Sequence, residues 1–141
     1  MSNSNDEEQI LYQISSRIID SGRDTRYDLG AYGFLMASLD YNRSKTESSG
    51  HIPARELVLA LIELSVMRFG PTAFTTLETW GIYTPLDIGR IVYNLIDIEI
   101  LSKSDDDSLD EFNKVEPFAE LINPQDSYEI NKDSLKNFID S

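Results

Sequence analysis

The sequence of 141 residues contains no cysteine and a single histidine, His51. Without cysteine, the chain can form no disulfide framework, thiolate zinc site, iron–sulfur cluster or cysteine nucleophile. Only carboxylates would remain to complete a zinc site around His51, and the HExxH pattern is absent. The glycines are isolated, so no GxGxxG or Walker sequence occurs that could hold a phosphate. The sequence therefore predicts neither a metal site nor a cofactor.

Basic residues are also scarce. Twelve Lys and Arg stand against 25 Asp and Glu, which gives a net charge of −13. Because proteins bind the phosphate backbone chiefly through Lys and Arg, this balance argues against a nucleic-acid partner. The charge is uneven: residues 1–96 carry a net −4, residues 97–141 carry a net −9, and all seven Arg lie at or before Arg90. We expect an organised front portion and a solvated acidic back portion.

Long hydrophobic runs are missing as well. The longest candidate, Ile88 to Leu101, is interrupted by four polar or charged residues, whereas a membrane-spanning helix needs ~18 apolar residues in a row. The first nine residues, MSNSNDEEQ, are acidic, unlike the basic start of a signal peptide. We therefore expect a cytoplasmic protein with no membrane contact. The length and the apolar content of 40% predict one domain with a hydrophobic core.

Helical periodicity dominates the rest of the chain. Apolar residues recur at helical spacing in five segments, approximately 7–21, 27–42, 53–69, 72–80 and 85–98. Asn5 or Asp6 is expected to cap the first helix and Gly22 to end it. The polar segment 43–50 predicts a loop. Thr84-Pro85-Leu86-Asp87 predicts a capping box at the start of the fifth helix.

Residues 100–115 favour a small β-hairpin. An apolar segment at 100–103 and an acidic turn at 105–108 precede residues 109–115, which fit a second strand or a short helix. Together with the helices at 72–80 and 85–98, the hairpin would complete a winged-helix-like helix-turn-helix. We thus expect a mainly α fold: a single helical domain of about five helices at 1–118 with a hairpin near 100–115. An acidic, partly flexible C-terminal tail would occupy 119–141.

Four clusters of residues support a family resemblance. They are Arg26-Tyr27 with Ala31-Tyr32 and Phe34; Gly50-His51 with Arg55-Glu56-Leu57; Phe69-Gly70-Pro71 with Ala73, Leu77 and Trp80-Gly81-Ile82; and Asp87, Gly89, Ile91-Val92 and Asn94-Leu95. In these clusters the chain resembles an uncharacterised family of small conserved hypothetical bacterial proteins of the Planctomycetes–Verrucomicrobia group. The resemblance covers roughly residues 10–118. It implies no activity, cofactor or partner, and it supports the domain limits alone.

Several residues are candidate contact or turn-organising residues. Arg26 and Tyr27 could form an aromatic–guanidinium patch with Tyr32, or Arg26 could cover a helix terminus. His51 could act as a general base or as a hydrogen-bonding loop residue. Trp80 could be an exposed anchor for a partner or a core residue.

The remaining candidates are charged or polar side chains on predicted helices. Arg55 and Glu56 could form ion pairs with neighbouring elements. Asp87, Arg90 and Asn94 lie on the helix that would serve as a recognition helix, where one Arg among acids cannot hold DNA. Gly89 lies in the same helix, where it costs roughly 1 kcal/mol relative to Ala. We therefore expect a close helix–helix approach at Gly89, with Trp80 or Phe74 as the neighbour.

These observations predict a non-catalytic, cytosolic protein-interaction module. It would bind another protein through the region 72–98 or through the tail, as a monomer or as a homodimer. One alternative is a winged-helix-like regulator that binds nucleic acid despite its charge. A second alternative is an enzyme that uses His51 with carboxylates.

Overall fold

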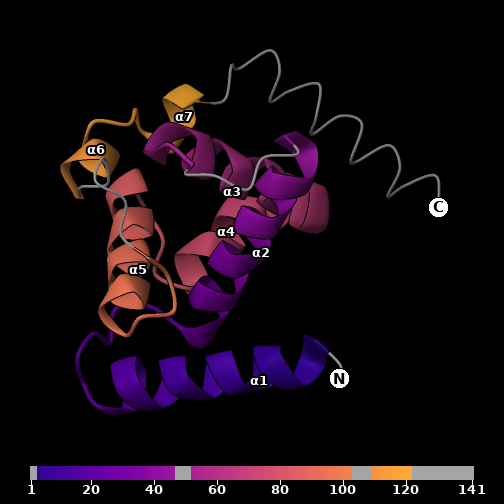
Figure 1. Cartoon of the computed structure of the whole chain (residues 1–141). Coiled ribbons are helices and arrows are strands. Elements are labelled where there is room, and N and C mark those ends of the chain that lie inside the picture. The colour runs from indigo at the N-terminus through magenta and orange to yellow at the C-terminus, as the bar shows by residue number, and fades with distance from the viewer. Residues whose placement is uncertain (1–2, 47–51, 103–108, 122–141) are drawn as a thin grey trace.

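A computed structural model describes residues 3–46, 52–102 and 109–121 (Figure 1). The fold is mainly α, as predicted, and every regular element of the described residues is a helix. In chain order these are α1 Asn3–Ile14, the π-helix η1 Ser15–Asp20, α2 Leu29–Thr46, α3 Ala54–Phe69, the 3₁₀ turn η2 Gly70–Thr72, α4 Ala73–Thr79, α5 Pro85–Asp97, α6 Leu109–Asn113 and α7 Phe118–Leu121.

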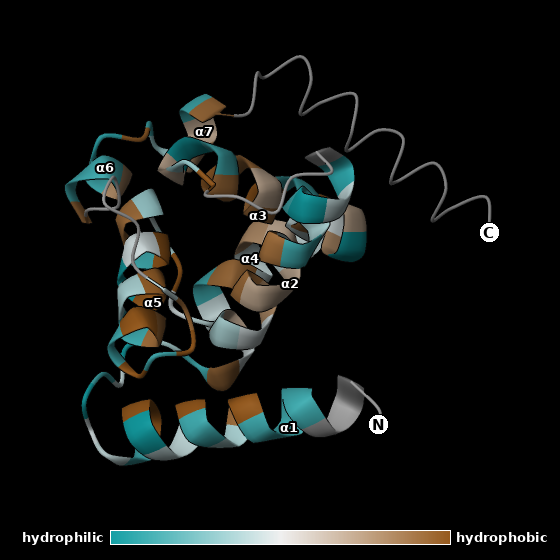
Figure 2. Ribbon diagram, viewed as in Figure 1, coloured by the Kyte–Doolittle hydropathy of each residue, from teal (hydrophilic) through white to brown (hydrophobic). Residues whose placement is uncertain are grey.

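The hydrophobic core lies where α2, α3 and α5 meet. α2 packs along α3, α6 packs on α5, and α1 crosses one end of α2 (Figure 1). Figure 2 shows the apolar residues of α1 on the edge turned toward the rest of the molecule. Each large apolar side chain that is fully buried contributes roughly 1.5–3 kcal/mol. The largest fully buried apolar side chains are Ile14, Ile18, Leu35, Leu61, Leu77, Ile82, Ile88, Ile91, Leu95 and Ile98.

The first helix begins earlier than predicted. Because α1 starts at Asn3, the predicted caps Asn5 and Asp6 lie inside its first turns, and the capping prediction is wrong. The end of the helix is confirmed at Gly22, which has a φ of 78° and donates its N–H to the Ile19 carbonyl at 3.1 Å. A left-handed φ of this kind favours glycine.

α2 is displaced toward the C-terminus relative to its prediction. It begins at Leu29 because Asp28 is its N-cap: one Asp28 carboxylate oxygen accepts the N–H of Gly30 at 2.9 Å. It continues to Thr46, so the predicted loop at 43–50 is wrong for its first four residues. The rest of that loop lies outside the described residues.

α4 and α5 occupy the segments predicted for the two short helices. The capping box is confirmed, since Asp87 donates its N–H to Thr84 Oγ1 at 3.4 Å and accepts the Thr84 N–H at 3.0 Å. Phe74 of α4, predicted to face inward, is instead 38% exposed and stacks on Phe118 of α7. Phe74 is thus covered in part by Phe118 and is not a core residue.

The hairpin predicted near 100–115 is not present in the described residues. Residues 100 and 101 form a bend, residue 102 has no regular structure, and Leu109–Asn113 form helix α6; residues 103–108 lie outside the described part. The short-helix interpretation of 109–115 therefore holds and the winged-helix hairpin is wrong. The reason is packing: Phe112 of α6 is buried against Gly89 of α5, and Val115, in the turn after α6, packs against the same core.

Phe112 also explains Gly89. A Cβ at Gly89 would lie 2.7 Å from Phe112 Cγ, so only glycine leaves room for the ring. The predicted close approach exists, but its neighbour is Phe112 of α6 rather than Trp80 or Phe74. Of the predicted tail, α7 includes residues 119–121, and residues 122–141 lie outside the described part.

The stretch Ala54–Thr79, which joins α3, η2 and α4, is long and apolar enough to cross a membrane by length and composition alone. It contains charged residues, so it is not a continuous apolar run in the sequence. In the fold, 44% of the apolar window is buried, and α3 packs against α2 and α4. A central helix of a helical domain has the same apolar character, so the stretch is weak support for a membrane span.

Candidate functional site

A buried polar network joins the loop at 22–28 to α5. The Asp24 carboxylate, 7% exposed, accepts hydrogen bonds from Arg26 Nε at 3.0 Å, Arg26 Nη2 at 2.8 Å and the Arg26 N–H at 3.0 Å. Asn94 of α5 donates its Nδ2 to Asp24 at 2.9 Å and to the Tyr32 hydroxyl at 3.0 Å. The hydrogen bonds from the Arg26 side chain lower the pKa of Asp24 to about 2. Burial alone would raise this pKa, and the hydrogen bond from Asn94 helps to lower it.

Asp87 forms the second half of the network. One carboxylate oxygen accepts the Tyr27 hydroxyl at 2.6 Å and Arg90 Nη1 at 3.1 Å. The other accepts the N–H groups of Tyr83 and Thr84 at 2.9 and 3.0 Å. Burial alone would raise the pKa of Asp87, but the bonds from Tyr27, Tyr83 and Thr84 outweigh it and lower that pKa. Burial and the bond to Asp87 raise the pKa of Tyr27.

The network fixes the loop in place. Tyr27 is buried, Arg26 lies 5.5 Å from the centre of its ring, and Tyr32 meets the same ring edge-on at 6.5 Å. Among the described residues, every buried side-chain nitrogen and oxygen has a hydrogen-bond partner. Asp24 and Asp87 are therefore ionised near neutral pH, and both carboxylates accept hydrogen bonds from the protein. These bonds hold the surrounding backbone in position.

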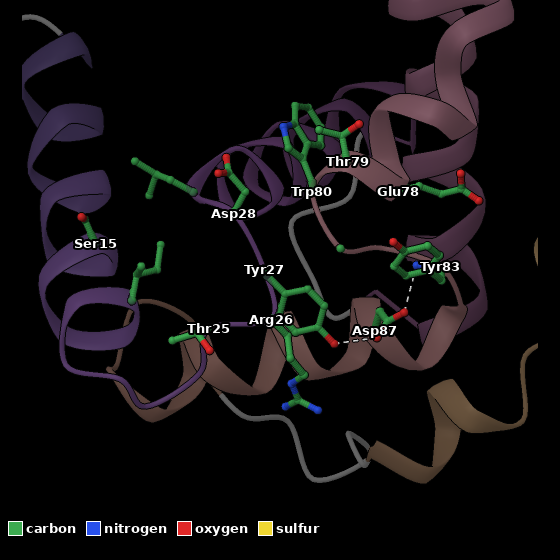
Figure 3. A pocket seen from close by; sticks show the side chains of 13 residues that line it. Ser15, Thr25, Arg26, Tyr27, Asp28, Glu78, Thr79, Trp80, Tyr83 and Asp87 are labelled. Atoms are coloured by element: carbon green, nitrogen blue, oxygen red, sulfur yellow. Dashed lines mark hydrogen bonds between the residues drawn. The ribbon is translucent and has the colours of Figure 1, made fainter.

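An open cleft of about 730 Å³ lies beside this network. η1 forms one wall, the loop at 25–29 forms the floor, and the segment from Glu78 to Asp87 forms the opposite wall (Figure 3). A π-helix such as η1 is rare and is frequent at functional sites. We call this hollow the η1–α4 cleft; its lining residues include Ser15, Ile19, Thr25, Arg26, Tyr27, Asp28, Glu78, Thr79, Trp80, Tyr83 and Asp87.

Two aromatic residues contribute to the cleft in different ways. Tyr83 lies between α4 and α5, and its side chain is exposed, with 62% of the residue in solvent. Trp80 is half-buried: its ring packs on Phe34 and Phe69, with ring centres 5.6 and 5.9 Å away. A Cβ at Gly30 would lie 2.5 Å from Trp80 Nε1, so glycine admits the indole at the start of α2.

The structure brings together five of the nine residues singled out from the sequence. Arg26, Tyr27, Asp87, Arg90 and Asn94 all belong to the network. Trp80 lines the cleft next to the network and packs against the core, which agrees with the core alternative, while its role as an anchor for a partner stays a prediction.

The other candidates lie apart from the network or outside the described residues. Arg55 pairs with Glu116 at 3.3 Å on the surface, which agrees with its expected ion pair. Glu56 is exposed on α3. His51 lies outside the described residues.

Sequence reasoning missed Asp24, Tyr83 and the acids at the cleft. Asp24 accepts the N–H of the residue two positions later, which is an Asx-turn, and a lone Asp between Gly22 and a helix start is a signal for such a turn. Tyr83 is a large aromatic within a turn bounded by Gly81 and Pro85, where an exposed ring has no core role. Asp28 carries no comparable signal, because its proximity to Trp80 is set by tertiary structure. Glu78 is two residues before Trp80 in the sequence, but nothing local shows that it lines the cleft.

The chain is thus a mainly α protein with an open, polar and aromatic cleft beside a buried ionic network. Among the described residues, no group of three or more His, Asp or Glu side chains is placed to hold a metal ion. Comparison of the chain with models of protein families, with curated proteins and with solved structures finds no match. The resemblance to the bacterial family stays a prediction.

Proposed function

We propose that this protein is a non-catalytic interaction module that binds another protein, in the cytoplasm, through the η1–α4 cleft. The observation that supports this most is Tyr83, an aromatic side chain that stays exposed at the edge of a hollow although its backbone is held by Asp87. Tyrosine and tryptophan are the residues most often found at the energetic centres of protein interfaces. An exposed Tyr and a half-buried Trp that line the same cleft provide such a centre.

The rigid surroundings of the cleft support the same proposal. Asp87 holds the N–H groups of Tyr83 and Thr84, and it is held in turn by Tyr27 and Arg90. The cleft therefore does not have to be ordered when a partner arrives, which lowers the entropic cost of association.

A second hollow, of about 740 Å³ between α1 and α2, is a weaker candidate. Its one lining aromatic, Tyr41, is half-buried and donates its hydroxyl to Glu63 at 2.7 Å. It therefore offers a partner no exposed aromatic anchor comparable to Tyr83.

The charge of the described residues disfavours the nucleic-acid alternative. The predicted wing is replaced by α6, which presents Asp110 and Glu111. The cleft is lined by three carboxylates and one guanidinium, which would repel a phosphate backbone. For the enzyme alternative, Asp24 and Asp87 have lowered pKa values, the opposite of what a general acid requires.

Site-directed photo-crosslinking tests the proposal. A benzophenone amino acid in place of Tyr83 should give a discrete crosslinked species in lysate of the source cells. The same residue in place of Tyr12 is the matched control, because Tyr12 is 73% exposed on α1 and does not line the cleft. The absence of a species specific to position 83, or identical species from both positions, would contradict the proposal.

A further inference from the structure

The cleft has more negative than positive charge, and the excess is concentrated in two side chains. Arg26, its one lining base, is neutralised by Asp24 at 2.8 Å, and Asp87 is neutralised by Arg90 at 3.1 Å. Asp28 and Glu78 remain: both are exposed, and neither has an ion-pair partner among the described residues. These two carboxylates are therefore available to an incoming group.

Asp28 and Glu78 lie on either side of Trp80 (Figure 3). The Asp28 N–H donates to the Trp80 carbonyl at 3.1 Å, and this hydrogen bond fixes Asp28 next to Trp80. One Asp28 carboxylate oxygen accepts the Gly30 N–H, and the other accepts no hydrogen bond from the described residues. Glu78 is two residues before Trp80 at the end of α4. The aromatic part of the cleft is thus flanked by two carboxylates.

Aromatic surface next to unpaired carboxylates complements one side-chain chemistry in particular. Lys and Arg have apolar stems that pack on aromatic rings, and their charged heads pair with carboxylates. A cation over an exposed aromatic ring is also attracted by the negative face of the ring. We propose that the η1–α4 cleft recognises a basic peptide segment of the partner protein, with Lys or Arg side chains against Tyr83 and Trp80 and paired with Asp28 and Glu78.

This inference rests on the proposed function and adds the chemistry of the partner. Because the two carboxylates lie on opposite sides of Trp80, a segment with at least two cationic side chains fits best. The overall charge of −13 assists by attracting basic partners over a longer range and accelerating their association.

The chain supplies its own reporter, because Trp80 is its one tryptophan. The probe is the blocked peptide acetyl-(Lys-Ala)4-amide, and acetyl-(Gln-Ala)4-amide is its neutral match. On titration at low salt, the basic peptide should change the Trp80 fluorescence and shift the amide NMR signals of Asp28, Glu78 and Tyr83. The neutral peptide should change neither. Equal effects of the two peptides, or shifts outside the cleft, would overturn the inference.

Two double variants separate a specific site from general attraction to an acidic protein. Asp28→Asn with Glu78→Gln should weaken binding of the basic peptide about tenfold. Asn still serves as an N-cap for α2, and the thermal unfolding midpoint verifies that the variant is folded. Glu8→Gln with Glu120→Gln makes the same change in net charge on exposed residues of α1 and α7, and it should weaken binding less than about twofold. Equal weakening by the two double variants would overturn the inference.

The crosslinking experiment distinguishes this inference from the proposed function. The species formed from position 83 should be lost when Asp28→Asn and Glu78→Gln are added. If that species forms at position 83 and persists with the added substitutions, the interaction module stands and the basic-segment inference fails. If no species specific to position 83 forms, the proposed function itself fails.

Discussion

Asp24 and Asp87 show how single side chains organise this protein. Asp24 lies in a turn and Asp87 in the first turn of α5. Each is almost fully buried, and each is held by a partner from a distant part of the chain: Asn94 for Asp24 and Tyr27 for Asp87. A buried carboxylate is costly unless it is fully hydrogen-bonded. Single substitutions in this network should therefore lower the free energy of unfolding strongly even when they remove only one polar group.

Tyr27→Phe tests the link between the loop and α5. It removes one hydroxyl, whose bond to the Asp87 carboxylate measures 2.6 Å. Because hydrogen bonds to charged groups contribute about 1.5–3 kcal/mol, the free energy of unfolding should fall by about that amount. Urea unfolding provides the measurement. Tyr12→Phe, at an exposed position, is the control and should change stability by less than about 0.5 kcal/mol; equal effects at the two positions would refute the prediction.

Asp24→Asn tests the ionic half of the network through pH. The pKa of Asp24 in the folded protein, about 2, lies below the ordinary value of 3.8, so the unfolded chain binds the proton more readily. The stabilisation is therefore complete well above pH 3.8 and is lost as the pH falls through about 2. At pH 7 the variant should be about 2 kcal/mol less stable than the parent.

The same variant should lose less stability than the parent between pH 5 and pH 2, because it has no carboxylate to protonate. Unfolding by urea at a series of pH values measures both curves. Asp20→Asn, on the exposed end of η1, should leave stability at pH 7 unchanged. A variant curve that stays parallel to the parent curve down to pH 2 would contradict the role given to Asp24.

At the scale of elements, the contact between α5 and α6 depends on the space at Gly89. Gly89→Ala adds a methyl group that would lie 2.7 Å from the Phe112 ring, so α6 must shift and stability should fall by about 1–3 kcal/mol. Thermal or urea unfolding measures the loss.

The effect of Gly89→Ala on stability should change sign when the Phe112 ring is absent. In a Phe112→Ala background, Gly89→Ala should stabilise the protein by up to about 1 kcal/mol, because alanine is the better helix former. The double-mutant cycle isolates this coupling. A loss of stability from Gly89→Ala in both backgrounds would show that something other than Phe112 occupies the space.

The helices were predictable because their signals are local. Helical periodicity, the Thr84–Asp87 capping box and Gly22 lie within a few residues of the structure that they determine. The hairpin was wrong because a short apolar segment fits a strand or a helix equally well until its packing partner is known. In the structure the packing partner of Phe112 is α5 at Gly89, and the segment that contains Phe112 is the helix α6.

At the scale of the whole molecule, the charge of −13 is a source of self-repulsion. Salt should therefore stabilise the fold. Between about 0.01 M and about 1 M NaCl the screening length falls from ~30 Å to ~3 Å, and the thermal unfolding midpoint should rise across this range. The Glu8→Gln, Glu120→Gln variant has two fewer negative charges, so its unfolding midpoint should rise less with salt than that of the parent. A midpoint that falls with salt would mean that attractive surface ion pairs outweigh the net repulsion.

The candidate site was predictable only in part. Arg26, Tyr27, Asp87, Arg90 and Asn94 were recognisable because polar or aromatic residues at helix starts and on apolar helices usually have a structural or functional partner. The sequence did not show that these residues share one network, because Tyr27 and Asp87 are 60 positions apart.

By itself, the sequence determined the mainly α class, the ends of α3, α4 and α5 to within one residue, the excess of acid and the absence of cysteine chemistry. These properties depend on composition or on neighbours within one or two helical turns. The tertiary structure decided which acids are buried in a shared network and which stay exposed. The ion pairs of Asp24 and Asp87, with Arg26 and Arg90, are local in sequence, but their hydrogen bonds to Asn94 and Tyr27 cross the fold. Asp28 and Glu78 are left exposed at the cleft beside Trp80. Contacts across the fold depend on distance in space, which the packing of the loop at 22–28 against α5 sets.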